Sequence, residues 1–289
     1  MNIALLTLLS FFTLLSCTNA PQNKLILNHH PTSIINGEPV INRDGLSKSV
    51  VGILMYYNMS ATEKAWIQGC TATVIDQKTI LTAAHCVDGF QPEELAINLS
   101  FDAINFETQF NPQTRISDSD VMSKLRAVKI KNFRMHPEYK EDAEHDIAVI
   151  VLNEDLPAEF APATFLPENT VNLDDLKTVF DGQTTDVVLI GFGVFQEDPR
   201  QNSEVLRQTT TPARFQNQFV ITDQSKGSGG CNGDSGGPAF FKWNDQYYLV
   251  GVTHGPYGDA TTCHEQGQWL NPNLFKQFIT NSIEAIKAN

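Results

Sequence analysis

Residues 230 to 238 read GCNGDSGGP and place one serine, Ser235, among small and polar residues. A serine hydroxyl is a weak nucleophile unless a base within hydrogen-bond reach takes its proton and a third group orients that base. Two interpretations are therefore open here, a nucleophile held by a glycine-rich turn or an unreactive loop serine. The choice depends on whether the rest of the chain supplies the base and the orienting acid.

His85 is the strongest candidate for the base among the seven histidines of the chain. It lies in LTAAHC, residues 81 to 86, at the end of an apolar segment and directly before Cys86. A disulfide from Cys86 back to Cys70 would hold the backbone beside this imidazole, and a general base needs such a fixed position.

Asp146, in HDIAVIVL, is the candidate for the orienting acid because it precedes an apolar segment. An unpaired carboxylate buried there would be costly. A hydrogen bond from the ring N–H of His85 would offset that cost and select one tautomer of the imidazole. For Asp146 taken alone, a polar residue that merely starts a strand is an equally good explanation.

Short strands must position these residues. The apolar segments are brief, rich in valine and isoleucine and separated by turn residues, as half-buried strands are. They are SVVGILMYY, CTATVID, ILTAAHCV, HDIAVIVL, DVVLIGFGV, PAFF and YYLVGVTHG. Only residues 272 to 288 show the spacing of a helix with one apolar face. This pattern predicts an all-β protein, a barrel or a sandwich, that ends in a helix.

Size and charge limit the possible functions. With 289 residues and 41% hydrophobic residues, the chain can form one large or two small domains with a substantial core. Its net charge of −13 argues against a nucleic-acid partner, because phosphate binding needs a basic surface. No residues have the spacing of a zinc or EF-hand site, and therefore we expect no metal and no cofactor. We also expect the protein to be a monomer.

The N-terminus is predicted to direct export. Residues 4 to 15 are apolar but short for a membrane span, which is typical of a signal peptide, here residues 1 to 20. The sequence ending at Cys17 resembles a bacterial lipobox, in which this cysteine would carry a lipid anchor; cleavage after Ala20 is the alternative. The other four cysteines then indicate two disulfides, with three possible pairings. They are Cys70, Cys86, Cys231 and Cys263.

The chain resembles the trypsin/chymotrypsin family of serine endopeptidases, and specifically an exported bacterial member of it. The segments that carry the resemblance are IINGEPV, TAAHC, HDIAVIVL, GFG and GCNGDSGGP. The histidine, aspartate and serine follow the family's order along the chain, which differs from that of subtilisins and α/β-hydrolases. The resemblance begins at Ile34 and implies two six-stranded antiparallel β-barrels with the active site between them. Their expected ranges are about 34–153 and 174–270, followed by a helix at about 272–288.

By position, the resemblance makes Ser235 the nucleophile, His85 the base that later acts as acid, and Asp146 the group that stabilises the imidazolium. The backbone N–H groups of Gly233 and Ser235 would form the oxyanion hole, where one donor is typically worth about 2.7–4 kcal/mol in the transition state. Glycine at 233 would let its N–H face the substrate, and a side chain at Gly236 would crowd the approach. Cys231 and Cys263 are expected to pair.

The resemblance also implies a zymogen. Cleavage after Ser33 would free the amino group of Ile34 to pair with Asp234, and residues 21 to 33 would be a pro-segment or spacer. Family zymogens usually present arginine or lysine before that bond, so the activating protease is not expected to be tryptic and is otherwise unknown.

The implied substrate pocket departs from that of trypsin. Six positions before the nucleophile, where trypsin carries an aspartate for lysine or arginine, the chain has Gly229. The implied pocket residues are Gly229, Gly230, Thr253, His254 and Gly255. Glycine walls predict a medium or large uncharged residue before the scissile bond. His254, where the family usually carries tryptophan, is expected to be a wall residue or, alternatively, to contact substrate acids.

The sequence therefore predicts an exported serine endopeptidase that acts on proteins or peptides through a Ser-His-Asp triad and an acyl-enzyme. It is either secreted or attached to the cell envelope through lipid on Cys17. The alternative is a catalytically silent binding or adhesion module with the same fold.

Overall fold

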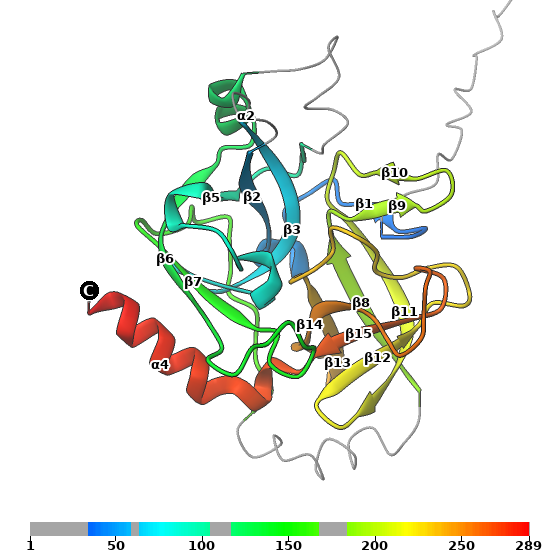
Figure 1. Ribbon diagram of the computed structural model, residues 1–289. Helices are drawn as coiled ribbons and strands as arrows, with labels where there is room; N and C mark the ends of the chain where they lie inside the picture. Colours follow the sequence, from blue (N-terminus) through cyan, green and yellow to red (C-terminus); the bar gives the residue numbers. More distant parts are fainter. Residues whose placement is uncertain (1–33, 59–63, 105–116, 168–183, 289) are drawn as a thin grey trace, which may run out of the picture. The chain divides into compact units, whose positions relative to one another are not determined.

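The computed structural model describes residues 34–58, 64–104, 117–167 and 184–288 (Figure 1). The predicted leader, the lipidation candidate Cys17 and the pro-segment at 21–33 lie outside these residues. All described residues belong to one compact unit. No helix within them is both long enough and apolar enough to span a membrane.

The first barrel is closed by antiparallel strands in the order β2-β3-β4-β7-β6-β5. Every residue of β4, β5 and β7 is buried, so both faces of these strands are covered. The strands are β2 (Val50–Asn58), β3 (Lys64–Asp76), β4 (Thr79–Thr82), β5 (Leu95–Asn98), β6 (Val128–Met135) and β7 (Ala148–Leu152).

The second barrel has the order β11-β12-β15-β14-β13-β8 and closes through pairing of β8 with β11. Its strands are β8 (Thr185–Gly191), β11 (Arg207–Gln216), β12 (Phe219–Asp223), β13 (Pro238–Trp243), β14 (Gln246–Pro256) and β15 (Gln266–Leu270). Strand β1 (Glu38–Pro39) pairs with β11, so these two residues join the second barrel, although they fall in the range expected for the first. Strands β9 (Val194–Gln196) and β10 (Gln201–Asn202) form a separate hairpin.

The two closed antiparallel barrels and the terminal helix confirm the predicted fold (Figure 1). After a 3₁₀ turn at Pro272–Phe275, helix α4 (Lys276–Lys287) packs against β6 and β7. Its buried residues include Ile279 and Ile286 from the predicted apolar face.

The short helix α2 (Asp118–Lys124) was not predicted. It begins after Ser117, whose side chain accepts a hydrogen bond from the backbone N–H of Asp120, as an N-terminal cap does. Of its seven residues only Val121 is buried. A helix with one buried residue has no apolar stripe, and therefore periodicity could not reveal it.

The topology brings distant residues to one edge of the first barrel. His85 lies in the 3₁₀ turn that follows β4, and Asp146 lies two positions before β7. Because β4 and β7 are antiparallel neighbours, with Thr82 opposite Ala148, the end of one strand meets the start of the other. Ser235 lies in the loop before β13, and His254 lies in β14, the partner of β13.

Candidate active site

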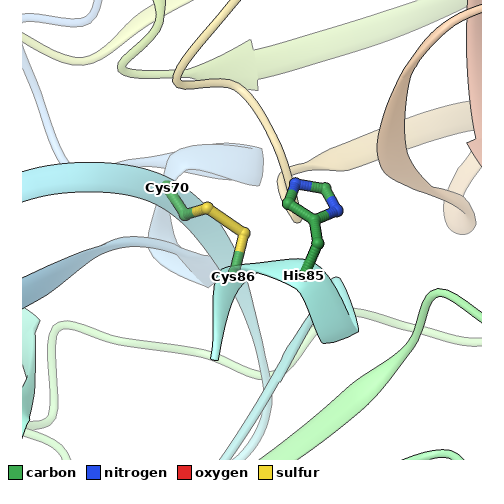
Figure 2. A group of neighbouring side chains, drawn as sticks. All are labelled: Cys70, His85 and Cys86. Carbon is green, nitrogen blue, oxygen red and sulfur yellow. A yellow bond between two sulfur atoms is a disulfide. The ribbon is translucent and has the colours of Figure 1, made fainter. Parts of the chain in front are cut away.

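Two disulfides hold the segments that carry the predicted site residues. Cys70 in β3 is bonded to Cys86 in the turn that carries His85, with Cα atoms 6.1 Å apart. Figure 2 shows the imidazole projecting away from the sulfur atoms. Cys231, in the serine loop, is bonded to Cys263, which precedes β15. Of the three possible pairings, the structure contains the one that the resemblance implied.

Asp146 orients His85 with both carboxylate oxygens. Oδ1 accepts the backbone N–H of His85 at 2.9 Å, and Oδ2 lies 2.6 Å from its Nδ1. Since an ionised carboxylate can only accept, we assign the proton to Nδ1, which leaves Nε2 free to take a proton. The side chain of Asp146 is fully buried, whereas that of His85 is partly exposed.

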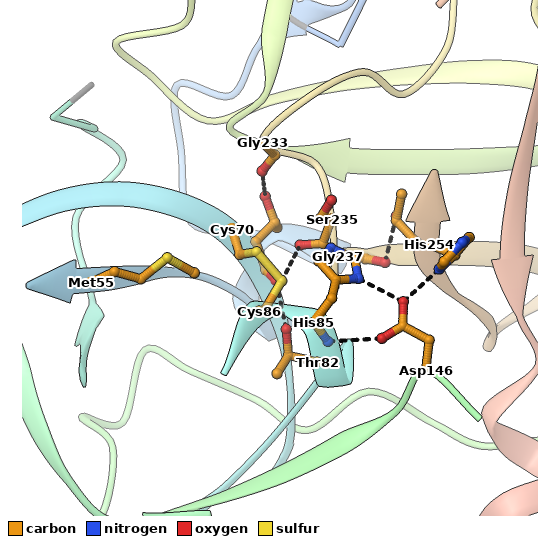
Figure 3. The surroundings of a disulfide bond; sticks show 12 residues. Met55, Cys70, Thr82, His85, Cys86, Asp146, Gly233, Ser235, Gly237 and His254 are labelled. Carbon is orange, nitrogen blue, oxygen red and sulfur yellow. Dashed lines mark hydrogen bonds and ion pairs between the residues drawn. A yellow bond between two sulfur atoms is a disulfide. The ribbon is translucent and has the colours of Figure 1, made fainter. Parts of the chain in front are cut away.

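A second imidazole binds the same carboxylate, and this contact was not predicted. His254 Nδ1 also lies 2.6 Å from Asp146 Oδ2, and its ring is 5.9 Å from that of His85, centroid to centroid. Figure 3 shows contacts from both histidines converging on Asp146. Since residues 146 and 254 are distant in sequence, the only available signal was a histidine inside an otherwise apolar strand.

These contacts explain how a buried carboxylate stays charged. Burial raises the pKa of Asp146, but hydrogen bonds from His254 and His85 outweigh that effect and lower it to about 2. Asp146 is therefore an anion at neutral pH, which suits it to stabilise a positive imidazolium.

Thr71 of the first barrel holds the serine loop. Its backbone N–H donates to the carbonyl of Ser235 at 2.9 Å, and its hydroxyl donates to the carbonyl of Gly233 at 2.9 Å. The same hydroxyl accepts the N–H of Phe192. With both carbonyls held on the Thr71 side, the loop backbone between them has a defined orientation.

The loop presents two free donors. Within the described part of the chain, the backbone N–H groups of Gly233 and Ser235 donate to no protein acceptor. Gly233 has φ of +96°, a conformation that favours glycine. Two free N–H groups beside a serine can bind a negatively charged oxygen. The described hydrogen bonds include none between Ser235 Oγ and His85, and such bonds are often long in unliganded sites.

Gly236 has a different role from the expected one. A Cβ there would lie 2.0 Å from Thr82 Oγ1 and 2.6 Å from the carbonyl oxygen of Thr71. The clash is with the first barrel, so this glycine permits the close approach of the serine loop to that barrel. Steric access for substrate is not what requires it.

Asp234 is buried and held by the backbone. Its carboxylate accepts the N–H groups of Gly193 and Cys231, each at 2.8 Å. These bonds lower its pKa, but burial dominates and raises it to about 7. The glycines of GFG make room for this group, since a Cβ at Gly191 or Gly193 would lie 2.2 or 2.4 Å from a carboxylate oxygen.

Ile34 and Ile35 lie against the second barrel. Ile34 is 1% exposed and packs in an apolar cluster that includes Val187 and Leu189. Ile35 forms a β-bridge with Gly229, in the segment before the serine loop. The nitrogen of Ile34 is part of a peptide bond in this chain, and the partners of Asp234 are the backbone amides of Gly193 and Cys231.

A cavity of about 110 Å³ adjoins Ser235. Four of the five expected pocket residues line it, namely Gly230, Thr253, His254 and Gly255. Gly229 does not line it, because the side chain of Gln224 covers that position. A second cavity, of about 620 Å³, is lined by Gly233, by residues of β2 and β3 and by residues between Phe192 and Ser203.

Four groups of described side chains hold potential metal ligands within 4.8 Å of one another. Two of them contain disulfide-bonded cysteines, and the other two are His85–Asp146–His254 and His136–Glu138–His145. In the first, the N–O separations of 2.6 Å are hydrogen-bond lengths. Ligands of a tetrahedral zinc ion lie roughly 3.3 Å apart. In the second, His145 Nε2 is already paired with Glu138 at 3.2 Å. The contacts of the first group are thus those of hydrogen bonds.

Comparison with known proteins places this site in a family. The chain is 27% identical to spermosin of Halocynthia roretzi over 225 residues, which cover 69% of this chain and 51% of that protein. It is 28% identical to serine protease grass of Drosophila melanogaster over 235 residues, 74% of this chain and 60% of that protein. It is 26% identical to transmembrane protease serine 11A of Homo sapiens over 227 residues, 73% of this chain and 47% of that protein.

The match thus spans about half to three fifths of the length of these relatives. All three come from animals, so they give no support to the bacterial type that the sequence predicted. The family model described as Trypsin matches residues 55–266, more than half of the chain and most of both barrels. The chain therefore belongs to the trypsin family of serine proteases.

Proposed function

We propose that this protein is an exported serine endopeptidase that cleaves proteins or peptides through an acyl-enzyme on Ser235. One arrangement carries the proposal. The His85–Asp146 pair lies beside a loop in which the N–H groups of Gly233 and Ser235 have no acceptor among the described residues. The family supports a protein substrate, and two disulfides are consistent with an oxidising compartment.

In the proposed reaction, Ser235 Oγ attacks the scissile carbonyl while His85 Nε2 takes its proton. The carbonyl oxygen becomes an oxyanion, to which Gly233 and Ser235 donate their N–H groups. His85 then gives its proton to the leaving amine, and an ester to Ser235 remains. Water attacks this ester with the same assistance from His85, which releases the acid product and restores the hydroxyl.

We further propose that His254 is a positioning residue. Its hydrogen bond to Asp146 Oδ2, the oxygen that His85 Nδ1 also contacts, holds the carboxylate in place and helps to keep it ionised. His254 thereby acts on the reaction through Asp146, without contact to the reacting atoms.

Replacement of His254 by phenylalanine keeps a ring but removes this donor. We expect kcat to fall about 10- to 100-fold, since a hydrogen bond to a charged group contributes about 1.5–3 kcal/mol. Asparagine, which can donate to the carboxylate, should restore part of the loss. The exposed His264, replaced by phenylalanine, is the matched control.

Acid stability gives an independent test of the same contact. The pKa of Asp146 is about 2, below its ordinary value of 3.8, so the stabilisation is present above pH 4 and is lost as the pH falls toward 2. It amounts to roughly 2 kcal/mol. In His254→Phe, the free energy of unfolding should vary less over this range. Equal kcat values and equal acid profiles for variant and wild type would refute the role.

Labelling with a fluorophosphonate probe tests the function. Three proteins are compared: one starting at Pro21, one starting at Ile34, and the Ile34 form with Ser235→Ala. We expect only the intact Ile34 form to react, because the extended chain lacks the free amino group proposed to pair with Asp234. Labelling of both intact forms would retain the nucleophile and reject the zymogen. Absence of labelling in all three would favour the silent binding module.

The N-terminal features remain part of the proposal. Residues 1–20 would direct export, residues 21–33 would be removed by an unidentified protease, and Cys17 could hold a lipid anchor. The protein would act as a monomer without a cofactor and would not bind nucleic acid.

A further inference from the structure

The cavity beside Ser235 is small for a substrate side chain. Its volume is about 110 Å³. A protein cavity of about 150 Å³ binds a single benzene molecule. The smaller cavity here therefore disfavours the ring of phenylalanine or tyrosine and favours alanine, serine, threonine or valine. Glycines in the walls had predicted a medium or large residue, so other side chains must occupy the depth.

Gln224 forms the floor of this cavity. It is 2% exposed, and its Nε2 donates to the carbonyls of Gly230 at 3.0 Å and Cys263 at 2.7 Å. Its Oε1 accepts from the N–H of Gly230 at 2.8 Å and from the Thr222 hydroxyl at 3.2 Å. The amide thus joins the two cavity walls that the Cys231–Cys263 disulfide also connects.

These four hydrogen bonds keep Gln224 in place when substrate enters. If its side chain moved aside, the buried groups that it pairs would be left without partners, which is unfavourable. The side chain of Gln224 also covers Gly229, because a Cβ at residue 229 would lie 2.1 Å from Gln224 Cδ. The glycine accommodates the glutamine and leaves no space for substrate.

Trp269 also lines the cavity. It is 1% exposed, and a Cβ at Gly230 would lie 3.0 Å from its ring, while one at Gly267 would lie 2.4 Å from it. These two wall glycines are therefore in contact with the indole. Their missing side chains make room for Trp269, and the cavity above it stays shallow.

The cavity also lacks a charged partner for substrate. Among the described residues that line it, His254 alone is ionisable, and its Nδ1 is hydrogen-bonded to Asp146. A lysine, arginine or glutamate side chain would lose its hydration there without gaining an opposite charge. The cavity therefore disfavours a charged substrate side chain.

We propose that the enzyme cleaves after a small uncharged residue, alanine, serine, threonine or valine, and that Gln224 determines this specificity by closing the pocket floor. The inference rests on the proposed peptidase function and specifies its substrate class.

Peptides that differ only in the residue before the scissile bond test the proposal on the form starting at Ile34. We expect kcat/KM for alanine or valine to exceed that for phenylalanine by at least about 10-fold, and that for lysine or glutamate by at least about 100-fold. In Gln224→Ala the floor is removed, so the ratio of phenylalanine to alanine should rise about 10-fold or more. The matched control is Gln246→Ala, an exposed glutamine at the start of β14.

Inhibition of the wild-type enzyme by peptide boronates tests the specificity of the pocket without a substitution at Gln224. An alanine boronate should bind at least about 10-fold more tightly than its phenylalanine counterpart. A labelled enzyme that prefers phenylalanine, leucine, lysine or glutamate would overturn the pocket inference and leave the peptidase function intact. A protein that reacts with neither boronates nor fluorophosphonate would overturn both.

Discussion

Replacement of Ser235 by alanine is expected to lower kcat for a peptide substrate by about 10⁴- to 10⁶-fold. The variant loses the only proposed nucleophile and cannot form the acyl-enzyme. KM should change little, because the cavity beside residue 235 keeps its other walls. Turnover of an internally quenched peptide by the form starting at Ile34 measures both constants. Long incubation makes the slow turnover of the variant detectable.

Two observations make this result interpretable. The exposed Ser225, in a turn of the second barrel, supplies the matched control, and Ser225→Ala should hydrolyse the peptide at the wild-type rate. Residual activity of Ser235→Ala should exceed the rate in water, since the donors at Gly233 and residue 235 remain. A Ser235→Ala protein with near wild-type turnover would remove Ser235 from the mechanism.

Cleavage after Ser33 is expected to stabilise the protein at pH 8 by several kcal/mol. In the uncleaved chain, burial raises the pKa of Asp234 to about 7, from an ordinary value of 3.8. A carboxyl group with a raised pKa contributes stability that is fully present below pH 4 and is lost as the pH rises through 7. The loss amounts to roughly 4 kcal/mol. A free ammonium at Ile34 would pair with the carboxylate, lower its pKa and remove this loss.

Urea unfolding between pH 4 and pH 9 measures the effect. Both forms, one starting at Pro21 and one at Ile34, carry Ser235→Ala so that neither digests itself. We expect stability to decline with rising pH in the longer form much more steeply than in the shorter one. Asp234→Asn should flatten the decline in the longer form, whereas Asp245→Asn, at an exposed site, should not. Parallel curves for the two forms would reject the Ile34–Asp234 pair.

Local patterns in the sequence were sufficient to predict an all-β protein with a terminal helix and the candidate triad, whereas the two barrels were implied by the resemblance to a known family. Short apolar segments between turn residues predicted the strands, and the spacing of Phe275 to Ile286 predicted helix α4, because these patterns record which side chains are buried. His85, Asp146 and Ser235 each stand in a distinctive short motif, so their types could be recognised without coordinates. Helix α2 and the pairing of β1 with β11 left no such trace.

Only the tertiary structure showed what surrounds these residues. His254 reaches Asp146 because the second barrel places β14 beside the residues that precede β7, and no local rule connects residues that lie 108 positions apart. The pocket illustrates the same limit. In the sequence, Gly229 and Gly230 show that side chains are missing, which suggested open space. Packing decided otherwise, because the close-packed interior fills such positions with Gln224 and Trp269 from elsewhere in the chain.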